Sequence, residues 1–151
     1  MVVHNEREAL CVAVEMENRA IRIYERAMLL VDDEAIREGI ETILQQEKQH
    51  LKRFKEMRER HPVGLQEEKM LLQAMGAEVL FPGGVMEMER AHGFTTLKGL
   101  YSFAAQSERQ AIDTYVACAE KCQDKGIAEA FRSIAAEESV HLAIFQEHES
   151  R

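Results

Sequence analysis

The stretch Glu47-Lys-Gln-His50-Leu51 recurs 91 residues later as Glu138-Ser-Val-His141-Leu142, and both copies lie within a longer internal repeat. Shifting the sequence by 91 positions aligns residues 13–57 with residues 104–148 without a gap, and fourteen of the 45 aligned pairs are identical. Two unrelated segments of ordinary composition would share about three identities. The sequence therefore predicts a structural unit that occurs twice in the chain.

Each copy of the repeat contains two segments with the spacing of an amphipathic helix. Apolar residues recur every three or four positions, as in Ile36, Ile40 and Ile43, which is the pattern of one helix face. Residues that favour helices are abundant, and the alternation typical of strands is rare. The sequence predicts four long helices, over residues 5–31, 33–60, 94–123 and 126–149.

The connection between the two copies is much longer than the turns inside them. Both prolines, Pro62 and Pro82, and five of the eight glycines fall within residues 61–93, where they interrupt long helices. A short helix is predicted at Leu65–Val79. A connection of this length can run from one end of a helical bundle to the other.

These elements predict an all-α chain with a single domain over residues 1–151, a length that can bury a substantial core. Each pair of long helices is joined by only a few residues and should form an antiparallel hairpin. The expected architecture is a four-helix bundle made of two duplicated hairpins, residues 5–60 and 94–149, joined by the long crossover at 61–93. This topology differs from the simple up-down-up-down bundle.

Each predicted hairpin carries one glutamate on the apolar face of its first helix and a Glu-x-x-His pair on its second. Residues three apart lie on one helix face, so the members of each pair can reach the same point. Burying four carboxylates together without counter-charge would be strongly destabilising, and two divalent cations remove that cost. Carboxylates with one imidazole per metal suit iron or manganese and also admit zinc. The predicted metal ligands are Glu17, Glu47, His50, Glu108, Glu138 and His141.

Taken one at a time, these residues have simpler interpretations. Each glutamate could be a solvated or salt-bridged helix residue, and each histidine a core residue with satisfied hydrogen bonds. Independent surface residues have no reason to follow the repeat and lie on the core face. The joint pattern therefore favours a metal site, and it is the ligand pattern of di-iron carboxylate bundles.

Four further side chains lie close to this pattern in the sequence. Tyr24 and Tyr115 each follow a predicted ligand glutamate by seven residues, two turns along the same face. Their phenols either hydrogen-bond to ligand carboxylates or pack at the ends of the bundle. Gln46 and Glu137 precede the Glu-x-x-His glutamates; they either orient the opposite histidine or are ordinary solvated residues.

The motifs Glu17-x-x-Ala20-x-x-x-Tyr24 and Glu108-x-x-Ala111-x-x-x-Tyr115, with the two Glu-x-x-His pairs, resemble the ferritin-like superfamily and in particular the rubrerythrin-type di-iron domain. The resemblance covers nearly the whole chain. It implies a ferritin-like bundle that holds two iron ions (Fe/Fe, with Fe/Mn or Zn as alternatives) and reacts with hydrogen peroxide or dioxygen. It also implies roles: Glu17 and Glu108 as terminal ligands, Glu47 and Glu138 as bridging ligands, and His50 and His141 each capping one metal.

The chain departs from rubrerythrins at two points. It has Ala111 where they carry an extra glutamate, which leaves a symmetric site like that of bacterioferritin. It lacks the paired CxxC motifs of a rubredoxin domain, so we expect electrons to come from a separate donor such as a rubredoxin. The resemblance implies a di-iron peroxidase or oxidase active in oxidative stress. A ferroxidase that handles iron is the first alternative, and a non-enzymatic, metal-binding helical interaction module is the second.

Composition limits the partners. The chain has 27 acidic and 19 basic residues, a net charge of −8, which argues against nucleic acid or an anionic membrane as a partner. Three cysteines without a CxxC motif and a start without a signal-peptide pattern favour a reducing, cytoplasmic setting. Oligomer symmetry makes a homodimer the default expectation, and the duplicated hairpins would allow a pair of helices to swap between subunits.

Overall fold

The computed structural model describes residues 3–78 and 97–149, and within these residues all regular structure is helical. The helices are α1 (Glu6–Leu30), α2 (Glu34–Arg60), α3 (Leu65–Glu78), α5 (Leu97–Lys121) and α6 (Lys125–Glu149). The predicted all-α class is therefore confirmed, and the helix ends lie within two residues of the predicted ones where both are described. Residues 79–93 of the predicted crossover and 94–96 of the third predicted helix lie outside the described residues.

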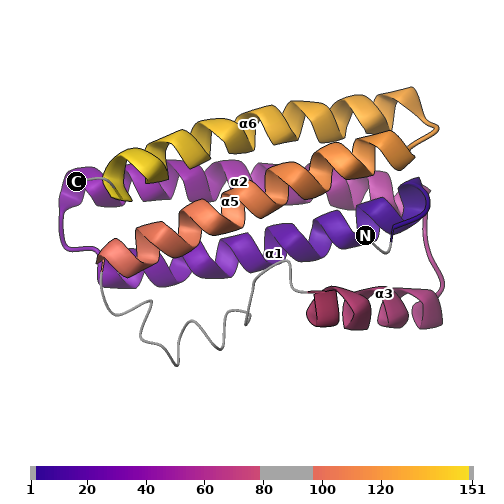
Figure 1. Ribbon diagram of the computed structural model, residues 1–151, viewed down its shortest axis with the longest axis horizontal. Helices are drawn as coiled ribbons and strands as arrows, with labels where there is room; N and C mark the ends of the chain where they lie inside the picture. The colour runs from indigo at the N-terminus through magenta and orange to yellow at the C-terminus, as the bar shows by residue number, and fades with distance from the viewer. Residues whose placement is uncertain (1–2, 79–96, 150–151) are drawn as a thin grey trace.

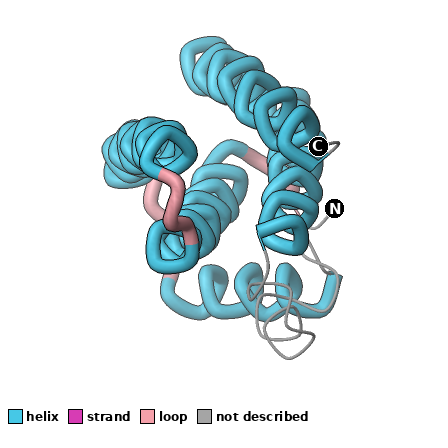
Figure 2. Tube along the Cα trace, turned by 90° about the vertical axis from the view of Figure 1, so that its left-hand side faces the viewer, coloured by secondary structure: helices cyan, strands magenta, loops and turns pink. Residues whose placement is uncertain are grey.

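The four long helices run side by side as two antiparallel hairpins, α1 with α2 and α5 with α6 (Figure 1). The end of α2 and the start of α5 lie at opposite ends of the bundle, so α2 and α5 run in the same direction. This is the topology that requires one long crossover. The hairpins meet mainly through α1 and α5, whereas α2 and α6 touch less, and α3 packs on the outside of α1. The view along the bundle shows the four long helices and α3 beside them (Figure 2).

The repeated aspartates cap the second helix of each hairpin. Asp33 Oδ1 accepts a hydrogen bond from the backbone N–H of Ile36 at 3.0 Å, and Asp124 Oδ1 accepts one from Ile127 at 3.0 Å. These contacts satisfy amide donors that have no partner within the helix. Asn5 caps α1 in the same way, through the N–H of Glu8. Local sequence therefore determines where these three helices start.

The apolar core consists of two clusters, and the repeat places equivalent residues in different clusters. One contains Phe54, Tyr115 and Ile134, and the other contains Phe145, Tyr24 and Ile43, which are their respective counterparts at the 91-residue offset. Burying a large apolar side chain stabilises a fold by about 1.5–3 kcal/mol. The two clusters therefore place apolar side chains on both sides of the middle of the bundle.

Among the described residues, no helix combines the length and the apolar character needed to cross a membrane. The three cysteines carry free thiols, and Cys11 and Cys118 are buried. Cys118 packs in the first apolar cluster, as expected for a small core residue.

Candidate metal centre

All six predicted ligands lie in the interior of the bundle. Each is at most 3% exposed, so these side chains are as buried as the apolar core around them. Ionisable residues are almost never this buried without a partner. The four long helices contribute one or two side chains each: Glu17, Glu47, His50, Glu108, Glu138 and His141.

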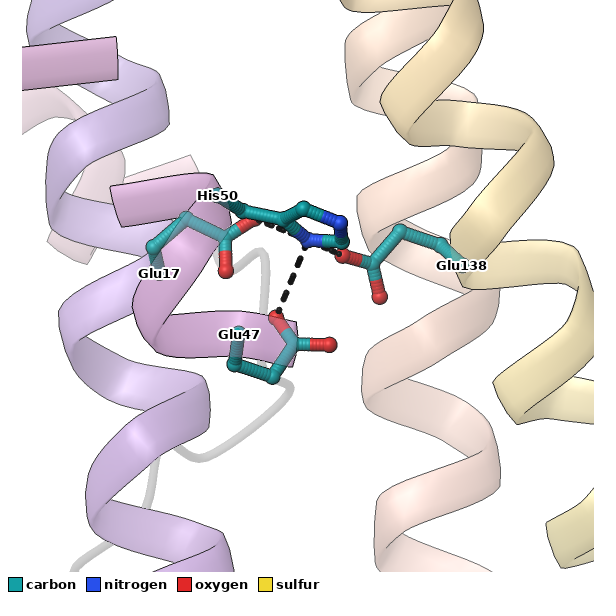
Figure 3. A group of neighbouring side chains, drawn as sticks. All are labelled: Glu17, Glu47, His50 and Glu138. Atoms are coloured by element: carbon teal, nitrogen blue, oxygen red, sulfur yellow. Dashed lines mark hydrogen bonds and ion pairs between the residues drawn. The ribbon is translucent and has the colours of Figure 1, made fainter. Parts of the chain in front are cut away.

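The first group of side chains surrounds His50 (Figure 3). Its Nδ1 atom lies 2.9 Å from Glu138 Oε1, 3.7 Å from Glu17 Oε1 and 3.7 Å from Glu47 Oε2. The three carboxylates come from α1, α2 and α6 and turn toward the same nitrogen. One ligand atom from each of the four residues lies within 4.8 Å of the others, which is close enough for a shared cation.

The second group surrounds His141 in the same way. Its Nδ1 atom lies 2.8 Å from Glu47 Oε1, 3.3 Å from Glu138 Oε2 and 3.7 Å from Glu108 Oε1. This group also brings one ligand atom per residue within 4.8 Å of the others. Glu47 and Glu138 belong to both groups, and each turns its two oxygens toward different histidines. The geometry thus describes two adjacent positions that share two carboxylates.

Several buried ligand atoms have no hydrogen-bond partner among the described residues. They are Glu17 Oε2, Glu47 Oε1, Glu108 Oε2 and His141 Nδ1. Two of these atoms, Glu47 Oε1 and His141 Nδ1, lie 2.8 Å apart without the alignment of a hydrogen bond. Unsatisfied buried oxygens and nitrogens are costly, and cations bound at both positions would satisfy them. The donor set therefore fits a pair of divalent metal ions.

Burial raises the pKa of Glu17, and it raises that of Glu47 to about 8, with the neighbouring Glu17 and Glu108 carboxylates adding to the effect. Burial opposes a charge on His141 as well, but the nearby carboxylates of Glu108, Glu138 and Glu47 favour the charged ring and raise its pKa to about 12. The pKa of His50 is raised against burial for the same reason. Without metal, protons therefore compensate the carboxylate charge, and two divalent ions with four positive charges would replace them.

Two buried tyrosines hydrogen-bond to the two carboxylates that belong to only one potential metal group each. The hydroxyl of Tyr115 donates a hydrogen bond to Glu17 Oε1 at 2.8 Å, and that of Tyr24 donates one to Glu108 Oε1. Burial and the neighbouring glutamates raise the pKa of both phenols well above the usual value, so both remain donors. Each tyrosine therefore bonds a predicted ligand carboxylate, and the carboxylate belongs to the opposite hairpin.

The second nitrogen of each histidine also has a partner from the opposite hairpin. His50 Nε2 lies 3.0 Å from Glu137 Oε2, and His141 Nε2 donates to the side-chain oxygen of Gln46. Because these oxygens accept the Nε2 proton, the Nδ1 lone pair of a neutral imidazole is directed to the shared positions. The orienting role that the sequence suggested for Gln46 and Glu137 therefore has a structural basis.

A small cavity of about 10 Å³ adjoins the carboxylates between α1 and α5, room for a single water-sized molecule. Its lining includes Met16, Ala20, Ser107 and Ala111 beside the glutamates. Ala20 and Ala111, equivalent in the repeat, are half-buried, so the cavity approaches the surface here. Sequence reasoning did not identify Ser107 as a neighbour of the centre; its counterpart Met16 shares no chemistry with it.

The four-helix bundle and the two Glu/His groups that share Glu47 and Glu138 define a carboxylate-rich helical domain with a candidate metal centre. The sequence model of the ferritin-like domain matches residues 5–150, and the chain therefore belongs to the ferritin-like domain family. No significant match was found among curated proteins or among solved structures.

Proposed function

We propose that this chain is a rubrerythrin-like, non-haem di-iron oxidoreductase that reduces hydrogen peroxide, or dioxygen, with electrons from a separate donor. The observation that carries the proposal is the sharing of Glu47 and Glu138 between the two potential metal groups. Shared carboxylates favour two ions side by side, which suits a two-electron reaction. Two bound irons would supply the two electrons that, with two protons, convert one hydrogen peroxide into two waters, and a donor such as a rubredoxin would return them.

The side chains of the protein would position this chemistry. Glu17 and Glu108 would be terminal ligands, each held by a tyrosine hydroxyl, while His50 and His141 would each cap one metal through Nδ1. The cavity beside the carboxylates is far smaller than the several hundred Å³ of a site for an organic substrate. Its size supports a diatomic or similarly small oxidant. The apolar clusters on both sides limit access of bulk water.

The decisive experiment is anaerobic iron loading of the full chain, metal analysis, and stopped-flow absorbance of the reduced protein mixed with peroxide or with oxygen. We expect about two irons per chain and faster oxidation by peroxide. Glu47→Gln should lower the iron content and the rate. Glu56→Gln, which makes the same charge change at an exposed position of the same helix, should change neither.

Other results of this experiment would favour one of the alternative functions or exclude the proposed site. Faster oxidation by oxygen, followed by continued oxidation of added ferrous iron, would favour a ferroxidase that handles iron. Less than one metal per chain after anaerobic loading would favour the non-enzymatic interaction module. A peroxide rate that Glu47→Gln leaves unchanged would remove the proposed site from the reaction.

We further propose that the protein acts in the cytoplasm as a homodimer, with helix pairs that can be swapped between subunits. The free thiols of the described cysteines agree with a reducing compartment. Light scattering of the metal-loaded protein should give twice the chain mass. A much larger assembly would instead support the iron-storage alternative.

A further inference from the structure

The two metal positions are related by the internal repeat, and nearly every side chain around them has an identical counterpart. The ligands and the two tyrosines all pair at the 91-residue offset. The partners of the two histidine Nε2 atoms break this rule, because Gln46 corresponds to Glu137. The imidazole at one position therefore hydrogen-bonds to a neutral amide, and the imidazole at the other hydrogen-bonds to a carboxylate.

The difference extends one residue further out. Glu137 Oε2 lies 3.0 Å from His50 Nε2 and 3.9 Å from Arg53 Nη1. The counterpart of Arg53 at the offset is Ile144, so the repeat places no equivalent cation beside Gln46. Arg53 is 45% exposed and Glu137 is 54% exposed, whereas His50 is 3% exposed. Two charged, partly exposed side chains thus connect His50 to the surface, whereas His141 contacts a neutral amide.

A carboxylate that accepts the outer N–H of a ligating imidazole makes the imidazole a stronger donor to its metal, and loss of such a partner typically lowers metal affinity 10- to 100-fold. An amide oxygen fixes the ring orientation but carries no net charge. The potential ligands themselves match at the two positions. Each position has one histidine, one glutamate of its own (Glu17 or Glu108) and the two shared glutamates. The residue that contacts the histidine Nε2, Glu137 at one position and Gln46 at the other, is therefore the main chemical difference between the positions.

We infer that the two positions are inequivalent, that the position capped by His50 binds its divalent ion more tightly than the one capped by His141, and that Glu137 is the positioning residue responsible. The inference rests on the two-metal site of the proposed function. It sets an order of filling: the first ion occupies the His50 position, and the ion at the His141 position is the first to leave in the presence of a chelator.

The test is anaerobic titration of the metal-free full chain with Mn²⁺ alone. Calorimetry and electron paramagnetic resonance monitor the titration. We expect two steps separated by about 10- to 100-fold in affinity, with an uncoupled Mn²⁺ signal at one equivalent. His141→Ala should keep the tight step, and His50→Ala should lose it. These variants identify the position that fills first.

Reciprocal substitutions at Glu137 and Gln46 separate an effect of charge on metal affinity from an effect of structural damage. Glu137→Gln should weaken the tight step by about 10- to 100-fold and bring the two affinities together. Gln46→Glu should strengthen the weak step by a similar factor, a gain that mere structural damage does not produce. Glu129→Gln, the same change at an exposed position of the same helix, serves as the control and should leave both steps unchanged.

The outcomes distinguish this inference from the function on which it rests. Two equal binding steps that neither reciprocal variant alters would overturn the inference and leave the two-metal site standing. A tight step that survives Glu137→Gln, or that is lost in His141→Ala and kept in His50→Ala, would also overturn it. Absence of Mn²⁺ and iron binding to the unmodified protein would overturn the metal site itself.

Discussion

The hydroxyl of Tyr115 on α5 lies 2.8 Å from Glu17 Oε1 on α1, so a side chain of the second hairpin holds a carboxylate of the first. Tyr24 of the first hairpin makes the reciprocal bond to Glu108 of the second. The contacts of His50 with Glu137 and of His141 with Gln46 cross between the hairpins as well. The candidate metal centre therefore forms only when the hairpins are docked on each other.

Tyr115→Phe should weaken both the fold and the metal site. The substitution keeps the ring among its aromatic neighbours but leaves the buried Glu17 Oε1 without its donor. We expect the free energy of unfolding of the metal-free protein to fall by about 1–3 kcal/mol and metal affinity to fall by about 10-fold or more. Urea denaturation and Mn²⁺ titration measure the two effects.

Tyr101→Phe is the matched control for that variant. The Tyr101 ring is buried, and its hydroxyl has no hydrogen-bond partner among the described residues. Removing this unsatisfied hydroxyl should leave the unfolding free energy unchanged or raise it, and it should leave metal binding intact. Equal effects of the two substitutions would mean that the Tyr115–Glu17 bond contributes nothing specific.

Glu17→Gln and Glu47→Gln should have different effects on metal content. Glu17 belongs to one potential metal group, whereas Glu47 belongs to both. After loading and desalting, Glu17→Gln should therefore retain about one ion per chain, and Glu47→Gln should retain less than one, because both positions lose a charged ligand. Elemental analysis gives the counts. Identical losses in the two variants would contradict the sharing of Glu47.

The ends and faces of the helices could be predicted from the sequence because local chemistry determines them. The repeated Asp33 and Asp124 cap their helices, and the spacing of apolar residues marks the buried faces. The six potential ligands were identifiable for the same reason, since ionisable residues on an apolar face that also follow a repeat require a common explanation. Tyr24 and Tyr115 were identified from the same faces.

The sequence suggested partners for the tyrosines and for Gln46 and Glu137, but most other contacts of these residues could not be predicted, because they depend on how the hairpins dock. The carboxylate nearest to His50 is Glu138 at 2.9 Å, whereas Glu47 of its own Glu-x-x-His motif lies at 3.7 Å. The proximity of Arg53 to Glu137 and the groove between α2 and α6, which Ile40 and Ile144 help to line, also arise from docking. The sequence spacing of these residues contains no signal for such contacts. His148, near the end of α6, is half-buried and stacks on Tyr101, with the ring centroids 4.9 Å apart.

The stability of the metal-free protein should fall as pH rises. The fold raises the pKa of Glu47 to about 8 from its usual value of 4.5, and that of His141 to about 12 from its usual value of 6.5. In both cases the folded state binds the proton more tightly than the unfolded state does. The contribution of this proton to stability is therefore complete below the pKa of the group in the unfolded state, and it is lost as the pH rises toward the pKa in the folded state. Between pH 6.5 and 8 both groups act in the same direction, by up to about 1.4 kcal/mol per pH unit for each proton.

Metal should reverse this trend, because ligands must lose their protons to bind it. Urea denaturation at pH 6.5, 7.25 and 8 should show falling stability without metal and rising stability with saturating Mn²⁺. Glu47→Gln should flatten the metal-free profile, since it removes one of the titrating groups. A metal-free protein that grows more stable over this interval would contradict the buried, protonated state of the centre.

Ala111→Leu should slow the reaction with peroxide without emptying the metal site. Ala111 lines the small cavity beside the carboxylates and is not a potential ligand, so a larger side chain there fills the space that an oxidant would need. We expect about two irons per chain, as in the unmodified protein, and oxidation by peroxide that is about tenfold slower, equivalent to about 1.4 kcal/mol in the barrier. Ala136→Leu, at an exposed position of α6, is the control and should react at the original rate. Because Ala20 lines the same cavity from α1, Ala20→Leu should reproduce the effect. An unchanged rate at full iron content in both cavity variants would show that the oxidant reaches the centre by a different route.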